Sequence, residues 1–258
     1  MLTTSLVFWN ETMRKNLEVC LNADSHIQLA DNVKTAFTAG ASRIELCSTM
    51  QLEGLTPSAT AMTIAAHAMP SEGELLIMIR PVANQFIVDA TILKLMLTQI
   101  AHAAHAGATG VVFGALNAND VDIAATTALI ACAHKYNLAT TFHRAFDCIE
   151  DSEQAIGLLT ELGIDRILTN GTKWTDDKGV MQGLNHIQTI ISHANDHIEI
   201  VIGGGVTTDN ASTLWQLANN NLVSLHAYSG VHNKDGWVDP LLINAILNQR
   251  TNEQAKND

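Results

Sequence analysis

Two short apolar segments of this sequence carry the same pair of reactive side chains. Glu18 precedes Cys20 by two positions, and Glu45 precedes Cys47 in the same way. Because side chains of a strand alternate between two faces, each Glu shares a face with its Cys. A buried carboxylate without a partner is costly, so the two Glu residues indicate a polar site. Thiols on neighbouring strands suit a soft metal ion. The alternative is that both cysteines are small core fillers.

Further along the chain, basic and acidic side chains stand at the ends of apolar segments. Arg80 is expected either to neutralise the two carboxylates or to grip an anionic substrate bidentately. His143, if it faces inward, is a candidate general acid/base or ligand, and Arg144 then pairs with an acid under the helices. Asp147 is expected to orient His143 or to bind substrate. His226 is the other histidine expected in a strand, and a merely hydrogen-bonded His143 is the alternative.

A glycine run late in the chain predicts an anion site. Gly203, Gly204 and Gly205 follow an apolar segment, and Asn170 and Gly171 end the segment before it. Backbone N–H groups after the seventh strand of a (β/α)8 barrel often hold a phosphate or carboxylate. The alternative for the glycines is tight packing of strand against helix.

These residues must be positioned by an alternation of strands and helices. We expect strands at Leu17–Asn22, Arg43–Cys47, Leu75–Pro81, Gly110–Asn117, Leu138–Asp147, Asp165–Gly171, Ile198–Val206 and Leu222–Ser229. Amphipathic helices are expected at Ser25–Ala39, Ser58–Met69, Ala90–Ala106, Val121–Tyr136, Ser152–Leu162, Met181–Ala194, Asp209–Asn219 and Pro240–Gln249. The pattern predicts a single-domain (β/α)8 TIM barrel over residues 17–250, with an N-terminal extension (1–16) and a polar C-terminal tail (251–258). A doubly wound open sheet is the alternative.

Composition excludes several classes of protein. Hydrophobic residues make up 47% of the 258 residues and the net charge is −12. The first value supports a large core, and the second disfavours binding to nucleic acid or to an anionic membrane surface. The sequence has neither a membrane-length apolar run nor a signal peptide, so a cytoplasmic protein with reduced cysteines is expected. No nucleotide or organic cofactor motif occurs, and no Lys lies in an expected strand to form a Schiff base.

Several of these segments together resemble the CutC copper-homeostasis family. They are Leu17–Cys20, Ala39–Cys47, Glu53–Ser58, Ile79–Pro81, Thr141–Asp147 and Gly203–Val206. The resemblance implies a cytoplasmic (β/α)8 barrel that forms a homo-oligomer (dimer or tetramer), with Cys20 and Cys47 as ligands of Cu(I). It also implies a shared polar centre, made of Glu18, Glu45, Arg80, His143, Asp147 and His226. The sequence departs from the family pattern at Val82–Gln85, where a second Arg and a Gly-rich loop are usual.

Two functions from different classes follow. The first is copper homeostasis, with copper ion bound through thiols at the mouth of the barrel. The second is a TIM-barrel enzyme, a lyase, isomerase or hydrolase, that performs acid/base chemistry on a small anionic or phosphorylated metabolite. The sequence does not choose between them.

Overall fold

The computed structural model describes residues 16–176, 178–218 and 222–254. Nearly all of the expected N-terminal extension (1–15) and the end of the expected polar tail (255–258) lie outside the described residues. Helix α8 (Pro240–Gln254) extends beyond its predicted end into that tail.

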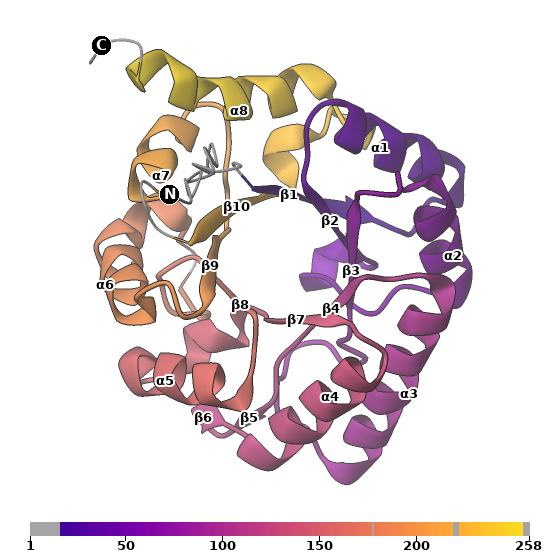
Figure 1. Ribbon diagram of the computed structural model, residues 1–258, viewed down its shortest axis with the longest axis vertical. Coiled ribbons are helices and arrows are strands. Elements are labelled where there is room, and N and C mark those ends of the chain that lie inside the picture. Colours follow the sequence, from indigo (N-terminus) through magenta and orange to yellow (C-terminus); the bar gives the residue numbers. More distant parts are fainter. Residues whose placement is uncertain (1–15, 177, 219–221, 255–258) are drawn as a thin grey trace, which may run out of the picture.

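Parallel strands close into a barrel, as predicted (Figure 1). They are β1 (Leu17–Asn22), β2 (Arg43–Cys47), β3 (Glu74–Met78), β4 (Gly110–Phe113), β7 (Ala139–Phe142), β8 (Arg166–Thr169), β9 (Glu199–Ile202) and β10 (Val223–Ala227). Strand β1 pairs with both β2 and β10, and this pairing completes the ring. The closed ring excludes the open doubly wound sheet. A short hairpin of β5 (Leu116–Asn117) and β6 (Asp120–Val121) lies outside the barrel sheet.

Helices surround the ring of strands (Figure 1). They are α1 (His26–Thr38), α2 (Ala59–Ala68), α3 (Ala90–Ala106), α4 (Ile123–Lys135), α5 (Ser152–Leu162), α6 (Leu184–Ala194), α7 (Ala211–Leu217) and α8. Asp89, Asp122 and Asp151 each accept a backbone N–H at a helix start, and α3 and α5 end at left-handed Gly107 and Gly163. Among the described residues, no helix has the length and apolarity needed to cross a membrane.

The strand side chains separate into two cores, as the alternation predicts. Val19 and Ile44 belong to the large cluster between the strands and the helices. Cys20 and Cys47 instead pack with Leu76, Met78 and Val112 in a small cluster inside the barrel. The interior of the barrel is therefore where the polar residues of β1 and β2 must find partners.

Several predicted strands extend too far at their carboxyl ends, and at β7 the difference reorients two site residues. Strand β7 ends at Phe142, and a 3-10 turn covers Arg144–Cys148. The side chain of His143 accepts the backbone N–H of Ala145, which bends the chain out of the strand. The predicted alternation of His143 and Arg144 on opposite strand faces is therefore wrong.

Candidate functional site

A cavity of about 250 Å³ opens among the carboxyl ends of the strands and the loops that follow them. Of the predicted site residues, its lining includes Cys20, Glu45, Cys47, Arg80, His143, Gly204, Gly205 and His226. Glu18, Asp147, Asn170, Gly171 and Gly203 are not among the lining residues. The predicted site residues therefore form two groups. Those of the first group line the cavity, and those of the second lie outside its lining.

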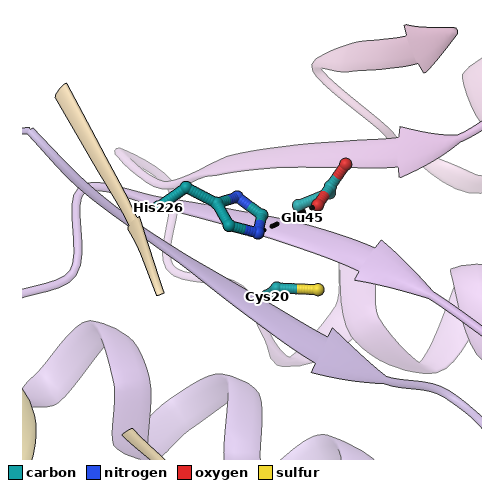
Figure 2. Close-up of side chains that lie close together, drawn as sticks. All are labelled: Cys20, Glu45 and His226. Atoms are coloured by element: carbon teal, nitrogen blue, oxygen red, sulfur yellow. Dashed lines mark ion pairs between the residues drawn. The ribbon is translucent and has the colours of Figure 1, made fainter. Parts of the chain in front are cut away.

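Three of the lining side chains converge from three adjacent strands (Figure 2). Cys20 comes from β1, Glu45 from β2 and His226 from β10, and one potential ligand atom from each lies within 4.8 Å of the others. The Nε2 atom of His226 is 3.6 Å from Oε2 of Glu45. Cys20 and Cys47 also pack in the same small cluster inside the barrel, and both are free thiols. The two thiols therefore lie together, as expected for neighbouring strands.

The register of β1 on β2 gives the two Glu residues different roles. In the pairing of β1 with β2, Cys20 lies beside Glu45 and Glu18 lies beside Arg43. The two Glu-x-Cys segments are therefore offset by two residues, and the two Glu residues do not lie side by side. The Oε2 atom of Glu18 consequently accepts Nε of Arg43 at 2.9 Å in a fully buried ion pair. Arg43 also donates to Glu199 at 2.7 Å. Glu18 therefore belongs to an ionic layer under the cavity rather than to its lining.

The charges around His226 favour a thiolate on Cys20. Hydrogen bonds from Cys47 and His226 lower the pKa of Cys20 to about 6, although burial opposes them. The pKa of Cys47 is raised well above its usual value, because its thiol donates to Cys20 and because it is buried. Hydrogen bonds to Cys20 and Glu18 raise the pKa of His226 against its burial. Burial raises the pKa of Glu45 well above its usual value, although the nearby charge of His226 opposes this shift.

Arg80 does not neutralise either carboxylate, which corrects one of its two predicted roles. Its Nη1 atom donates to the carbonyl oxygens of Leu52, Glu53 and Gly54 at 2.8–3.3 Å. The guanidinium lies over the ring of Phe86, 5.1 Å from the centroid. Its Nε atom is buried and has no hydrogen-bond partner in the described part of the chain. The other predicted role, gripping an anion, remains available to this side chain.

His143 faces the cavity as a neutral imidazole. Its Nδ1 atom accepts the N–H of Ala145 at 3.1 Å, so the proton of the neutral ring resides on Nε2. Burial and the nearby charge of Arg80 lower the pKa of His143 to about 3. The ring also lies 5.0 Å from the ring of Phe86. His143 is therefore a hydrogen-bond donor toward the cavity at neutral pH.

Asp147 does not orient His143, which corrects one of its two predicted roles, and it is not among the residues that line the cavity. It accepts Nε of Arg144 at 2.8 Å, which also corrects the expected pairing of Arg144 with an acid under the helices. The other oxygen of Asp147 accepts the hydroxyl of Thr169, and the backbone N–H of Asn170 reaches the carboxylate at 3.4 Å. Asp147 thus ties the turn after β7 to the end of β8.

The predicted anion cradle is only partly available. The N–H of Asn170 is used by Asp147, that of Gly171 by Thr169, and that of Gly203 by the carbonyl of Thr169. Gly204 and Gly205 line the cavity in left-handed conformation. A Cβ on Gly204 would lie 2.6 Å from Cβ of Asn170, so the glycine there permits close packing of two loops.

Sequence reasoning missed several residues that shape the site. Arg43 could have been found, because it shares the inward face of β2 with Glu45 by the same alternation. Phe86 and Trp174 come from loops, and their rings meet edge to face at 4.9 Å beside Arg80. Met50 and Met78 line the cavity near the thiols. No sequence signal distinguishes these four side chains from ordinary apolar residues.

Comparison with known proteins gives consistent relatives. The model of the CutC family matches residues 15–229. A family protein CutC from Aliivibrio fischeri (strain MJ11) is 37% identical over 203 residues, covering 78% of this chain and 77% of its own length. One from Pasteurella multocida (strain Pm70) is 31% identical over 241 residues, covering 93% and 91%.

Solved structures agree with these relatives. The "Putative Copper Homeostasis Protein CutC" from Streptococcus agalactiae superposes with a TM-score of 0.72 and 29% identity, covering 83% of this chain and 98% of that one. A 3-keto-L-gulonate-6-phosphate decarboxylase from Vibrio cholerae, at 17% identity and a TM-score of 0.59, shares the fold alone. With a family model that matches most of its length, this chain belongs to the CutC family.

Proposed function

We propose that this protein binds copper as Cu(I) inside the barrel, with Cys20 and Cys47 as ligands. The observation that carries the proposal is the packing of two buried, free thiols in one small cluster on the cavity wall. Cu(I) prefers soft sulfur ligands. Met50 and Met78 add thioethers to the same small cluster. The name of the Streptococcus agalactiae relative supports the choice of metal.

His226 supports the two thiols in this arrangement. Glu18 accepts Nδ1–H of His226 at 2.7 Å, which fixes the orientation of the ring and raises its pKa. A protonated His226 stabilises the Cys20 thiolate, which is the form that binds metal. Burial raises the pKa of Glu45, which disfavours the carboxylate form that would bind a harder ion such as Zn²⁺.

An anaerobic Cu(I) titration against a competing chelator tests the proposal. Wild type is expected to take up Cu(I) tightly, and Cys20→Ser/Cys47→Ser is expected to lose the tight binding. Cys132→Ser is the matched control, because Cys132 lies on α4, outside the lining of the cavity. Equal affinity of the double variant and wild type would overturn the ligand assignment. Zn²⁺ binding that is stronger than Cu(I) binding and is lost in Glu45→Gln would assign the site to zinc instead.

A second candidate function is acid/base chemistry on a small anion, and one observation favours it. Glu45 is buried, burial raises its pKa, and its Oε1 atom has no hydrogen-bond partner among the described residues. Such a carboxyl is poised to give a proton to a bound molecule. Metal transfer requires no group of this kind. Turnover of candidate metabolites by wild type, lost in Glu45→Gln while Cu(I) binding persists, would support an enzyme.

A further inference from the structure

One wall of the cavity carries hydrogen-bond donors that the thiol site does not use. Arg80 is 5% exposed and its Nη1 atom is fully engaged by loop carbonyls. Its Nε atom is buried without a hydrogen-bond partner among the described residues, and the hydrogen bonds from the guanidinium to the loop carbonyls come from Nη1. Nε and Nη2 form the edge of the guanidinium that receives carboxylate or phosphate bidentately. A buried cationic N–H without a partner is costly, which indicates that a ligand completes this edge.

His143 supplies a second donor beside this edge. Since its Nδ1 atom already accepts the N–H of Ala145, Nε2 carries the proton of the neutral ring. His143 is 4% exposed, and it lines the same cavity as Arg80. Phe86 lies between them, with the guanidinium of Arg80 5.1 Å and the ring of His143 5.0 Å from its centroid. Arg80 and His143 are thus positioned by one aromatic ring.

The side chains of Arg80 and His143 are held in place by the residues packed around them. Trp174 packs edge to face on Phe86 at 4.9 Å and lies 5.9 Å from the guanidinium of Arg80. A Cβ on Gly114 would come within 2.6 Å of two atoms of the His143 ring, so the glycine there makes room for the imidazole. The donors therefore hold their directions before a ligand arrives, which reduces the entropy that binding must overcome.

We propose that this cavity binds a small organic anion whose oxyanion, a carboxylate or a phosphate, is held by the Nε–Nη2 edge of Arg80 and by Nε2–H of His143. The cavity volume of about 250 Å³ limits the ligand to a small metabolite. The thiols and Glu45 line the same space and would contact the rest of the molecule. This inference names the class of ligand on which the second candidate function would act. Binding of the anion does not depend on that function, whereas any reaction of the bound anion rests on it.

Titration of metal-free protein with malonate and with inorganic phosphate, at constant ionic strength in a calorimeter, tests the site. Wild type is expected to bind one of the two with a millimolar or lower dissociation constant. Arg80→Lys keeps the charge but removes the bidentate edge, and it should weaken binding by about tenfold or more. His143→Asn keeps an acceptor for the N–H of Ala145, but its shorter side chain has no donor at the position of Nε2–H, and it should weaken binding in the same direction.

Controls separate this site from general charge and from the copper proposal. Lys178→Gln removes an exposed cation that pairs with Asp176 outside the cavity lining, and it should leave anion affinity unchanged. Cys20→Ser/Cys47→Ser should still bind the anion even if Cu(I) binding is lost. A preference for malonate identifies a carboxylate ligand, and a preference for phosphate identifies a phosphate ester.

Two results would overturn the proposal. One is the absence of binding of either anion to wild type at millimolar concentration. The other is unchanged affinity in both Arg80→Lys and His143→Asn. If Arg80→Lys loses its cooperative thermal transition because the loop carbonyls lose their donor, His143→Asn alone decides. Neither result would bear on Cu(I) binding by the thiols, so the two proposals fail separately.

Discussion

The imidazole of His226 lies between two buried carboxyl groups whose pKa values are shifted in opposite directions. Its Nδ1 atom donates to Glu18 at 2.7 Å, and its Nε2 atom is 3.6 Å from Glu45. Arg43 and His226 lower the pKa of Glu18 to about 2, whereas burial raises the pKa of Glu45. One ring thus connects an ionic layer inside the barrel to the cavity above it.

Cys20 is expected to react with iodoacetamide as a thiolate from mildly acidic pH upward. Its pKa of about 6 means that the thiolate is present above that pH and is lost as the pH falls through it. Replacing Cys47 by Ser weakens the hydrogen bond to Cys20 and should shift the pH profile upward. Mass spectrometry of the modified peptides measures the rate at each cysteine.

Cys132 is the internal reference in that experiment, because burial raises its pKa. Its modification should begin at higher pH than that of Cys20. Reaction of Cys20 and Cys132 with the same pH profile would contradict the charge arrangement around His226.

Glu18→Gln should destabilise the protein by about 3 kcal/mol at pH 7, because it leaves Arg43 and His226 without a buried anionic partner. The folded-state pKa of Glu18, about 2, is depressed below 4.5. Its stabilisation is therefore complete above about pH 4.5 and is lost as the pH falls toward 2. Urea unfolding of both proteins across this range measures the difference.

Glu153→Gln provides a matched control for Glu18→Gln, since Glu153 also pairs with a histidine, His193, at 3.1 Å. That pair is exposed, so its loss should change stability by less than about 1 kcal/mol. An equal effect of the two substitutions would show that burial of the Glu18 pair does not matter.

Gly114→Ala should destabilise the protein by about 1–3 kcal/mol and weaken malonate or phosphate binding together. The added Cβ would lie 2.5 Å from Cε1 of His143, which must then move.

Gly157→Ala in α5 is the contrasting variant, because nothing lies within 4 Å of the new methyl group. It should stabilise the helix by about 0.5–1 kcal/mol and leave anion affinity unchanged. Thermal melts and calorimetry check both changes, and normal anion binding by Gly114→Ala would count against the position assigned to His143.

Trp174 fluorescence should report occupancy of the anion site. Its indole lies 5.9 Å from the guanidinium of Arg80 and 4.8 Å from that of Arg144, so a bound anion changes the local field. The intensity change should saturate with the calorimetric dissociation constant and disappear in Trp174→Phe. Trp237→Phe, which is outside the cavity lining, should retain it. A signal that survives in Trp174→Phe would place the ligand elsewhere.

The barrel and its inward-facing residues follow from the sequence alone. Strand and helix alternation predicts the closed fold, and the two-residue period predicts that Cys20 and Cys47 face away from Val19 and Ile44. These features depend on local geometry, because adjacent side chains of a strand must point to opposite faces. The resemblance of short segments to the CutC family is equally a property of the sequence, and the match to the family model confirms it.

Only the tertiary structure decided what each inward residue contacts. The stagger of β1 on β2 places Glu18 against Arg43 and Cys20 against Glu45, although the two Glu-x-Cys segments look equivalent. Stagger is fixed by closure of the whole barrel, so no single strand encodes it. The unpartnered Nε of Arg80 likewise depends on a distant loop, which engages Nη1 of the guanidinium and leaves Nε without a hydrogen bond to the described residues.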